Sequence, residues 1–278
     1  MNKSDILLVL KELKINPKKS LGQNFLFDKN TINKIIIEAE ISENDIILEI
    51  GPGLGALTKD LLDKAEMVYV IETEGKFCSF LEKKFDDRDN FSIIHGDILE
   101  VDLPKHDKVV SNIPYSITGP ILEKVFFREN PPQGILTIEK KIADRIFFNG
   151  DYDDFSRVTV STNSFMNPMK QTKISPKGFY PKPNIELSLI RLNPKEEVDP
   201  FLKDNITRKF YLDFIAGIMP YKNKNIANAI ELCCKNNLNL NLAKKEISQI
   251  LSSLNYENNK LINFKIKDFI EIAKTIYN

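Results

Sequence analysis

The chain has 278 residues, of which 42% are apolar and 28% are charged, and its formal net charge is zero. This composition is typical of a soluble globular protein, and the length allows one α/β domain and a smaller second domain. Zero net charge removes any argument for a nucleic-acid partner from composition alone. No apolar run approaches the ~20 residues that span a bilayer, and residues 6–10 are too few for a signal peptide, so we expect a cytoplasmic protein.

The sequence contains three cysteines, Cys78, Cys233 and Cys234. They form no CxxC pair, and the adjacent Cys233 and Cys234 have no histidine or further cysteine at zinc-binding spacing. We therefore expect buried free thiols and no metal site.

Two helices are expected before the first strand. One lies within residues 1–13, with Ser4 or Asp5 as its N-cap. Another follows Asp28, because apolar residues recur there at helical spacing. From residue 46 onward, buried strands alternate with helices. The predicted strands are 46–50, 67–71, 92–95, 108–111 and 134–138, and the predicted helices are 57–62, 77–85, 121–127 and 140–148. This alternation predicts a doubly wound, parallel, Rossmann-like sheet.

The pattern changes after the fifth strand. Residues 158–165 and 185–192 are interpreted as two strands that form an antiparallel hairpin at the sheet edge, connected by the proline-rich loop 175–183. After Pro194 the chain is rich in Asn, Lys, Leu and Ile at helical spacing. We therefore predict an α/β domain over residues 1–193 and a small α-helical domain over residues 194–278.

Glycines and acids follow successive predicted strands. Gly51, Gly53 and Gly55 let a backbone approach a ligand closely, although a plain tight turn would also use them. Glu72 ends the next strand about 20 residues on and could accept hydrogen bonds from ribose hydroxyls. Asp97 follows the third strand and could bind an adenine amino group. Either acid alone could be a solvated carboxylate, but together these groups predict an adenosine-containing cofactor. The G-x-G-x-G spacing disfavours a nicotinamide dehydrogenase.

The fourth predicted strand leads into Asn112-Ile113-Pro114-Tyr115. This segment combines a hydrogen-bonding amide, a stiff turn and a flat ring at the sheet edge where ligands bind in open α/β folds. That combination suits a site that holds the exocyclic amine of a flat base while a group is transferred to it.

With these residues in place, the chain resembles the KsgA family of S-adenosylmethionine-dependent small-subunit rRNA adenine dimethyltransferases. The resemblance extends from about Lys18 to the C-terminus. Its pieces are KSLGQNFL (19–26), EIGPGLGALT (49–58), VIE (70–72), GDI (96–98), NIPY (112–115), IEKKIADRI (138–146) and FYPKP (179–183).

The resemblance implies a role for each matching position. The methionine part of S-adenosyl-L-methionine would be covered by Gln23, Asn24 and Leu26. Gly51 and Gly53 would let the cofactor pass close to the backbone. Glu72 would hold its ribose, and Asp97, followed by Ile98, its adenine. At the junction with the target base would lie Asn112, which contacts both. Tyr115 and Phe179 would stack on the two faces of that base, although core filling by Tyr115 and packing of Phe179 on the sheet edge are the alternatives.

The chain departs from the family pattern at three places. Glu74 stands where the family usually has Asp, Glu139 stands where it usually has Gln, and residues 154–158 lack the glycine of the family's Tyr-Gly-Arg-Leu-Ser stretch. These departures affect expectations about loop geometry and substrate positioning, and they leave the proposed cofactor contacts unchanged.

The chemistry explains why an amide would be used. An adenine 6-amino group is a poor nucleophile, because its lone pair is delocalised into the ring. If the Asn112 side-chain oxygen and the Ile113 carbonyl each accept one N–H, the nitrogen can direct its lone pair at the methyl group. No strong base is needed, and neither His95 nor His106 lies in a motif.

RNA binding is predicted from the positions of the lysines. Residues 166–184 contain no acid and four lysines: Lys170, Lys173, Lys177 and Lys182. Other candidates are Lys18, Lys19, Lys222 and Lys224. A basic rim around the base site is one interpretation, and scattered solvated lysines are the alternative. The C-terminal helices would recognise folded RNA by its shape.

The sequence thus predicts a monomeric enzyme of ribosome biogenesis. It would dimethylate two adjacent adenines near the 3′ end of small-subunit rRNA within a pre-ribosomal particle. One alternative is an Erm-type methyltransferase of large-subunit rRNA, although residues 210–277 look more like the KsgA family. The other is a non-catalytic RNA-binding assembly factor that keeps the fold.

Overall fold

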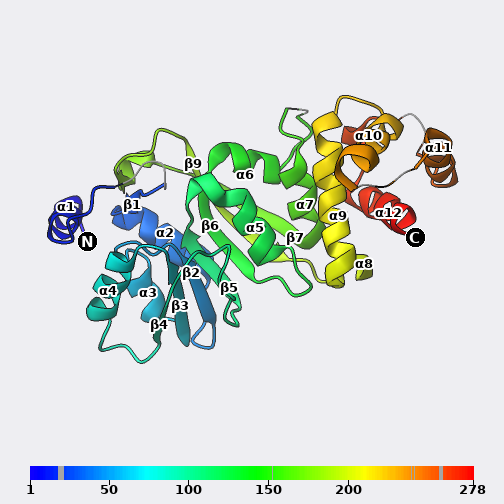
Figure 1. Cartoon of the computed structure of the whole chain (residues 1–278). Helices are drawn as coiled ribbons and strands as arrows, with labels where there is room; N and C mark the ends of the chain where they lie inside the picture. The colour runs from blue at the N-terminus through cyan, green and yellow to red at the C-terminus, as the bar shows by residue number, and fades with distance from the viewer. Residues whose placement is uncertain (18–21, 152, 239, 241, 257–258) are drawn as a thin grey trace. The chain divides into compact units, whose positions relative to one another are not determined.

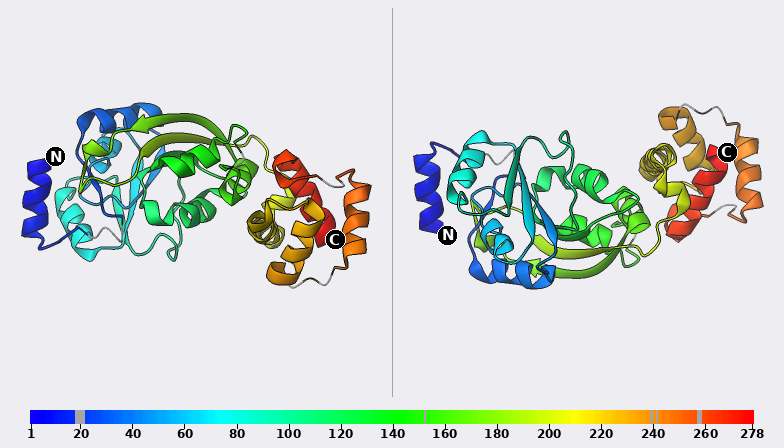
Figure 2. Two further views of the ribbon diagram at one scale, coloured as in Figure 1. Left: turned by 90° about the horizontal axis from the view of Figure 1, so that it is seen from above. Right: turned by 90° about the horizontal axis from the view of Figure 1, so that it is seen from below.

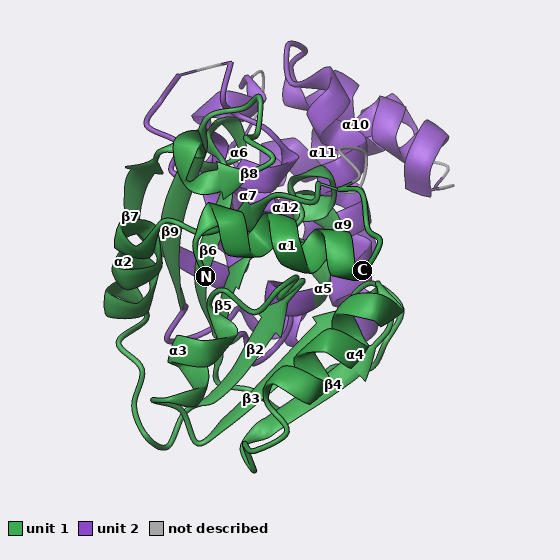
Figure 3. Cartoon of the chain, turned by 90° about the vertical axis from the view of Figure 1, so that its left-hand side faces the viewer, with its two compact units in different colours: residues 1–124, 132–143, 168–193 green, residues 125–131, 144–167, 194–278 purple. Residues whose placement is uncertain are grey.

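The computed structural model describes residues 1–17, 22–151, 153–238, 240, 242–256 and 259–278 (Figure 1). They form two compact units that do not follow chain order (Figure 3). Unit 1 comprises Met1–Lys124, Pro132–Ala143 and Pro168–Asn193. Unit 2 comprises Val125–Pro131, Asp144–Asn167 and Pro194–Asn278. The helical C-terminal region therefore shares a unit with two earlier segments of the chain.

The central sheet contains seven strands within the described residues, in the order β4-β3-β2-β5-β6-β9-β7. These strands are β2 (Ile46–Ile50), β3 (Met67–Glu72), β4 (Phe91–His95), β5 (Lys108–Asn112), β6 (Gln133–Glu139), β7 (Met166–Ile174) and β9 (Leu187–Pro194). Strands β2 to β6 pair in parallel, and β9 pairs antiparallel to β6. The order reverses between β2 and β5, so the predicted doubly wound sheet is confirmed.

The helices before and between these strands also match the prediction. They are α2 (Lys29–Ala39), α3 (Thr58–Leu62), α4 (Gly75–Lys84), α5 (Thr118–Phe126) and α6 (Lys140–Ile146). Helix α2 begins after Asp28, whose carboxylate accepts the Thr31 N–H at 2.9 Å. Its apolar face includes Ile35, which is fully buried. Ile47 and Val68 of the neighbouring strands are fully buried in the same core.

The predicted N-cap of the first helix is wrong by at least two residues. Helix α1 (Lys3–Glu12) is capped by Asn2, whose side chain accepts the Asp5 N–H at 3.0 Å. Asp5 in turn accepts the Asn2 N–H at 2.7 Å. Ser4 and Asp5 thus belong to the first turn, and Asp5 completes a capping box that the cap residue begins.

Residues 158–165, predicted as a strand, form helix α7 (Arg157–Phe165) instead. The helix begins at Ser156, whose N–H is accepted by the Thr159 hydroxyl at 3.1 Å. Within unit 2 the Ser164 hydroxyl lies 2.7 Å from that of Tyr211, so tertiary packing stabilises the helix. The edge strand is β7, which starts directly after α7 and neighbours β9.

The segment predicted as a loop between the edge strands contains a short strand, β8 (Phe179–Tyr180). It pairs antiparallel with β1 (Phe25–Leu26), with Leu26 opposite Phe179 and Phe25 opposite Tyr180. This two-stranded ribbon brings the predicted base-stacking residue next to the N-terminal motif, although the two are far apart in sequence.

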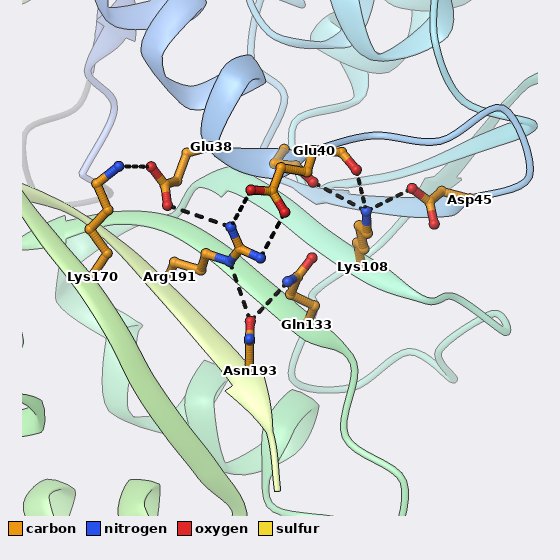
Figure 4. A network of polar contacts seen from close by, with 9 residues as sticks. Glu38, Glu40, Asp45, Lys108, Gln133, Lys170, Arg191 and Asn193 are labelled. Carbon is orange, nitrogen blue, oxygen red and sulfur yellow. Dashed lines mark hydrogen bonds and ion pairs between the residues drawn. The ribbon is translucent and has the colours of Figure 1, made fainter. Parts of the chain in front are cut away.

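A polar network supports the sheet at the end where the parallel strands begin (Figure 4). Lys108, the first residue of β5, donates from Nζ to the carbonyls of Ala39 at 3.2 Å and Glu40 at 2.7 Å. The same ammonium lies 2.8 Å from the Asp45 carboxylate. It therefore caps the C-terminus of α2, where backbone carbonyls lack helical partners.

Arg191 of β9 continues this network. Its guanidinium lies 2.8 Å from Glu40 and 3.8 Å from Glu38, and it holds the pKa of Glu40 below its ordinary value. Lys170 of β7 forms an ion pair with Glu38. Helix α2 is thus tied to β5, β7 and β9 (Figure 4).

Unit 2 is helical. With α7 it contains α8 (Pro200–Lys203), α9 (Asn205–Ile218), α10 (Ile226–Cys233), α11 (Lys244–Ser253) and α12 (Ile266–Tyr277). Figure 2 shows the yellow-to-red helices grouped around one another. Their core includes Tyr211, Phe214 and Phe269, all fully buried. Within the described part of the chain, no helix has the length and apolarity needed to cross a membrane.

Candidate active site

A cavity of about 260 Å³ lies in unit 1 at the carboxyl ends of the parallel strands. Its walls come from β1, from the glycine-rich turn after β2, and from the ends of β3, β4 and β5. All residues predicted to bind a cofactor line it: Gln23, Asn24, Leu26, Gly51, Gly53, Glu72, Asp97, Ile98 and Asn112. The fold thus brings together residues that are separated by up to 89 positions in the sequence.

The glycine-rich turn needs glycine for two physical reasons. Gly51, Gly53 and Gly55 have φ angles of +65°, +57° and +74°, in the left-handed region that other residues rarely adopt. Space is also limited, because a Cβ at Gly55 would lie 2.9 Å from the Leu81 side chain. A Cβ at Gly53 would lie 3.2 Å from the Phe25 ring. The exposed backbone of this turn forms part of the cavity wall.

Glu72 fixes that turn to the end of β3. Its carboxylate accepts backbone N–H groups from Gly53 at 3.2 Å, Thr73 at 2.9 Å and Glu74 at 3.0 Å. Burial raises the pKa of Glu72, and the three N–H donors partly offset that effect. Glu74 contacts Glu72 through its backbone N–H, so the departure from the family pattern at this position leaves the contact unchanged.

Asp97 and Ile98 form the wall after β4. The Asp97 carboxylate accepts the Leu99 N–H at 2.9 Å through Oδ1, and Ile98 is 3% exposed. One acceptor of Asp97 thus closes its own turn, and its other oxygen retains acceptor capacity. The buried Ile98 provides an apolar surface of the kind on which a flat base packs.

Glu49 is a cavity residue that the sequence analysis left without a role. It lies in β2, is 3% exposed, and accepts a hydrogen bond from the Thr58 hydroxyl at 2.6 Å. Burial raises the pKa of Glu49 to about 8. The sequence did indicate a role for Glu49, because an acid within an apolar run such as 46–50 is rarely buried unless it has a partner or a function.

Helix α1 contributes a wall that no sequence motif indicated. Ile6 lines the cavity and packs in one buried cluster with Phe25, Leu54 and Phe77. The Lys76 ammonium donates to the Leu13 carbonyl at 3.0 Å, just beyond the end of the helix. Amphipathic spacing predicted the helix, but which surface its apolar face covers depends on the tertiary fold.

Asn112 lies where the cofactor side of the site meets the predicted base side. Its Nδ2 donates to the Asn24 carbonyl at 3.3 Å. Its Oδ1 accepts the Tyr115 hydroxyl at 2.8 Å. The following residues Pro114, Ser116 and Ile117 also line the cavity.

The two aromatic residues predicted to stack on the base lie in the buried core of unit 1. Tyr115 is 8% exposed and Phe179 is 2% exposed, and both belong to the main buried cluster of unit 1. Neither is among the described residues that line the cavity. Burial raises the pKa of Tyr115 well above its ordinary value, so its hydroxyl stays protonated. Stacking by these rings remains a prediction.

Several lysines of the predicted basic rim are engaged within the protein. Lys170 and Lys173 form ion pairs with Glu38 and Glu186. Lys222, in unit 2, donates to the Phe155 carbonyl at 2.9 Å. Lys18 and Lys19 lie outside the described residues, as do the next two positions of the N-terminal motif, Ser20 and Leu21.

The remaining departures from the family pattern are not among the described residues that line the cavity. Glu139 ends β6 and is opposite Leu187 of β9. Residues 154–158 lead into α7 in unit 2, where the Thr159 hydroxyl also donates to the Asp154 carbonyl at 3.1 Å. This stretch therefore forms the start of a helix.

Residues 14–274 match the model of a protein family described as ribosomal RNA adenine dimethylase. The chain belongs to this family. A probable ribosomal RNA small subunit methyltransferase A from Methanococcoides burtonii is 35% identical over 92% of each chain. The predicted family and the enzyme class that its description names are therefore confirmed.

Solved structures show the same fold. A dimethyladenosine transferase from Plasmodium falciparum has a TM-score of 0.76 and 27% identity, covering 91% of this chain and 97% of its own. The 23S rRNA methyltransferase ErmE has a TM-score of 0.62 and 22% identity, covering 91% of this chain and 100% of its own. The second likeness shows only that the fold is shared.

Proposed function

We propose that this protein transfers methyl groups from S-adenosyl-L-methionine to the 6-amino groups of two adjacent adenines near the 3′ end of small-subunit rRNA. The position of Asn112 carries this proposal. Its side chain lines the cavity that contains every predicted cofactor residue, and it begins the segment predicted to receive the base. The names of curated relatives such as that of M. burtonii support small-subunit rRNA as the substrate.

The cavity suits an adenosine cofactor that has an amino-acid tail. Glu72 and Asp97 retain acceptor capacity for hydroxyl and amino groups, and Ile98 and Phe77 supply apolar wall. The glycine turn offers its backbone without side chains. When bound, the cofactor would supply a methyl group on a positively charged sulfur.

Asn112 would act by orienting the adenine amine. An amide oxygen has two lone pairs, and the Tyr115 hydroxyl uses one of them. The other can accept an adenine N–H, while the Ile113 carbonyl accepts the second N–H. These acceptors stabilise the positive charge that develops on nitrogen, so the residues contribute mainly positioning and electrostatics.

We further propose that the enzyme acts as a monomer on a pre-ribosomal particle in the cytoplasm, because its substrate would be a subunit under assembly. The helices of residues 194–278 would contact folded RNA by shape and phosphate contacts. Lys224 and the lysines of the 175–183 segment are the candidates for phosphate contacts.

Methyl transfer to ribosomal subunits tests this proposal. Small subunits lacking the modification and large subunits are incubated separately with the enzyme and methyl-labelled S-adenosylmethionine. We expect label only in small-subunit RNA, recovered as N6,N6-dimethyladenosine in a 3′-terminal fragment. Label only in large-subunit RNA would instead establish the Erm-type activity. Tight binding to small subunits without any label would identify a non-catalytic assembly factor.

A further inference from the structure

A chain of three hydrogen bonds runs from the cavity wall into the buried core of unit 1. The Tyr115 hydroxyl donates to Asn112 Oδ1 at 2.8 Å, and Asn112 Nδ2 donates to the Asn24 carbonyl at 3.3 Å. Asn24 Nδ2 then donates to the Gly22 carbonyl at 3.0 Å. This chain links the N-terminal segment of the cofactor cavity to the residue that would hold the target amine.

The partners of Asn112 determine which way its amide faces. A backbone carbonyl can only accept, so the Asn24 carbonyl requires the NH₂ end of the amide. The oxygen end must then face the Tyr115 hydroxyl, which donates to it. The reversed amide would place two acceptors against each other at Asn24. The bond to Asn24 is long, and the Tyr115 hydroxyl therefore makes the shorter of the two orienting contacts.

We propose that the Tyr115 hydroxyl is the group that positions the Asn112 amide for methyl transfer, separately from any stacking by the Tyr115 ring. This inference rests on the proposed function, because it assigns Asn112 the role of acceptor. Tyr115 is accordingly a positioning residue that acts through Asn112.

The surroundings of Tyr115 suit this role. The side chain is 8% exposed, so water competes little for the hydroxyl. Its backbone is held in place, since the Thr118 hydroxyl donates to the Tyr115 carbonyl at 3.1 Å. A Cβ added at Gly22 would lie 3.4 Å from the Tyr115 nitrogen, so the N-terminal segment packs closely against the same backbone. Both the ring and the main chain are therefore fixed before a substrate arrives.

Tyr115→Phe tests the inference, because it removes one oxygen and keeps the ring. We expect kcat to fall about 10- to 100-fold, the range that follows when one positioned hydrogen bond of the catalytic group is lost. The KM for small subunits and the Kd for S-adenosylhomocysteine should remain within about two-fold of wild type. A merely structural role would change these binding constants and the thermal stability together.

Tyr211→Phe is the matched control. Tyr211 is also buried and its hydroxyl bonds to a side chain, Ser164, at 2.7 Å, but it lies in unit 2. We expect this variant to keep the wild-type kcat. Full kcat in Tyr115→Phe would overturn the inference. So would a raised KM for subunits at unchanged kcat, because the hydroxyl would then contact the substrate directly.

A measurement without turnover separates this inference from the proposed function. The Asn112 side-chain amide is assigned in the NMR spectrum of the wild-type complex with S-adenosylhomocysteine by its disappearance in Asn112→Ala. We expect two sharp amide protons in wild type and exchange-broadened ones in Tyr115→Phe. Unchanged sharp signals in Tyr115→Phe would contradict the inference. Wild type that binds S-adenosylhomocysteine but methylates neither subunit would instead contradict the proposed function.

Discussion

The candidate site has a cofactor half, made of the residues predicted to bind the cofactor, and a base half, made of the residues predicted to stack on the target base. The two halves differ in whether their residues line a cavity. On the cofactor side, every predicted residue lines one cavity, and Glu72 holds the glycine-rich turn through backbone hydrogen bonds. On the base side, Tyr115 and Phe179 are packed in the core of unit 1. Asn112 is shared by both halves.

Because of this difference, cofactor affinity would depend on one half of the site, and the catalytic step would depend on a change in the other half. A cavity with fixed donors and acceptors binds its ligand without reorganisation, whereas the residues packed on two buried rings must move aside before a base can stack between the rings. The cost of exposing them would be met by the RNA, so the enzyme would bind its cofactor well in the absence of substrate. Such a division would also limit methylation of the wrong RNA.

The sharpest test of the comparison is Asn112→Ala. We expect methylation of small subunits to fall about 1000-fold, because the amine loses an acceptor that matters most in the transition state. The Kd for S-adenosylhomocysteine, measured by calorimetry, should change only a few-fold. Full methylation activity in this variant would show that Asn112 is not the acceptor and that the two halves do not meet there.

Glu72→Gln tests the cofactor half. Two carboxylate oxygens now accept three N–H groups, and the amide NH₂ of glutamine cannot accept the Gly53 N–H. We expect the Kd for S-adenosylhomocysteine to rise about 10- to 100-fold, the range for loss of a hydrogen bond to a charged group. Glu74→Gln is the control, since Glu74 meets Glu72 only through its backbone. Equal Kd values for the two variants would contradict the role of Glu72.

Helix α1 allows a test of how much of the cofactor half is formed by apolar packing. Ile6 is 1% exposed and lines the cavity, whereas Leu8 on the same helix is 60% exposed. We expect Ile6→Ala to lower the free energy of unfolding by about 2 kcal/mol and to weaken cofactor binding. Leu8→Ala should change the free energy of unfolding by less than about 0.5 kcal/mol. Urea unfolding with and without S-adenosylhomocysteine measures both variants. Equal effects of the two substitutions would mean that α1 is not part of the cavity wall.

Glu49 gives the cofactor half a pH dependence. Native Glu49 keeps its proton up to a pKa of about 8, whereas in the unfolded chain it ionises near 4.5. The unfolded state therefore binds fewer protons between these values, and stability falls as pH rises through this window. The slope due to Glu49 is at most about 1.4 kcal/mol per pH unit. Between pH 5.5 and 8, we expect the free energy of urea unfolding to decline less steeply with pH in Glu49→Gln than in wild type. Equal slopes would contradict the burial argument.

The parallel strands could be predicted from sequence to within one residue at most ends. Their central residues are largely buried, except in β4, so most of these strands contain a short apolar run bounded by polar residues. Such a run is a local signal. Once the strands were located, Glu72 and Asp97 could be placed at one site, because the carboxyl ends of parallel strands share one edge of the sheet.

The failure at residues 158–165 has a different origin. Val158, Thr159, Val160 and Thr162 favour a strand by their local preferences. Their helical form depends on Ser156 and on Tyr211, which lies far along the chain. Tertiary packing thus overrides local propensity, which a single sequence does not reveal.

Sequence reasoning left open whether Tyr115 and Phe179 face the base or pack in the core. A motif indicates which residue types meet, but their exposure depends on every element packed around them. The same limit applies to Ile6, whose helix was predicted and whose contact with Phe25 and Leu54 was not. Residue type and spacing predicted the chemistry. Only the three-dimensional packing showed that the cofactor half lines a cavity and that the two rings of the base half are buried.

The ribbon of β1 and β8 has a consequence for how the enzyme is made. Leu26 of the N-terminal motif is held opposite Phe179, so this part of the cavity wall pairs with a segment synthesised much later. Ribosomes add about 5–20 residues per second and early segments fold first, so the nascent chain passes through a stage with a sheet but an unfinished cofactor pocket. Pairing over so long a separation is also slow to form. A ribosome-bound chain that stops before residue 179 should therefore be unable to retain the methyl donor.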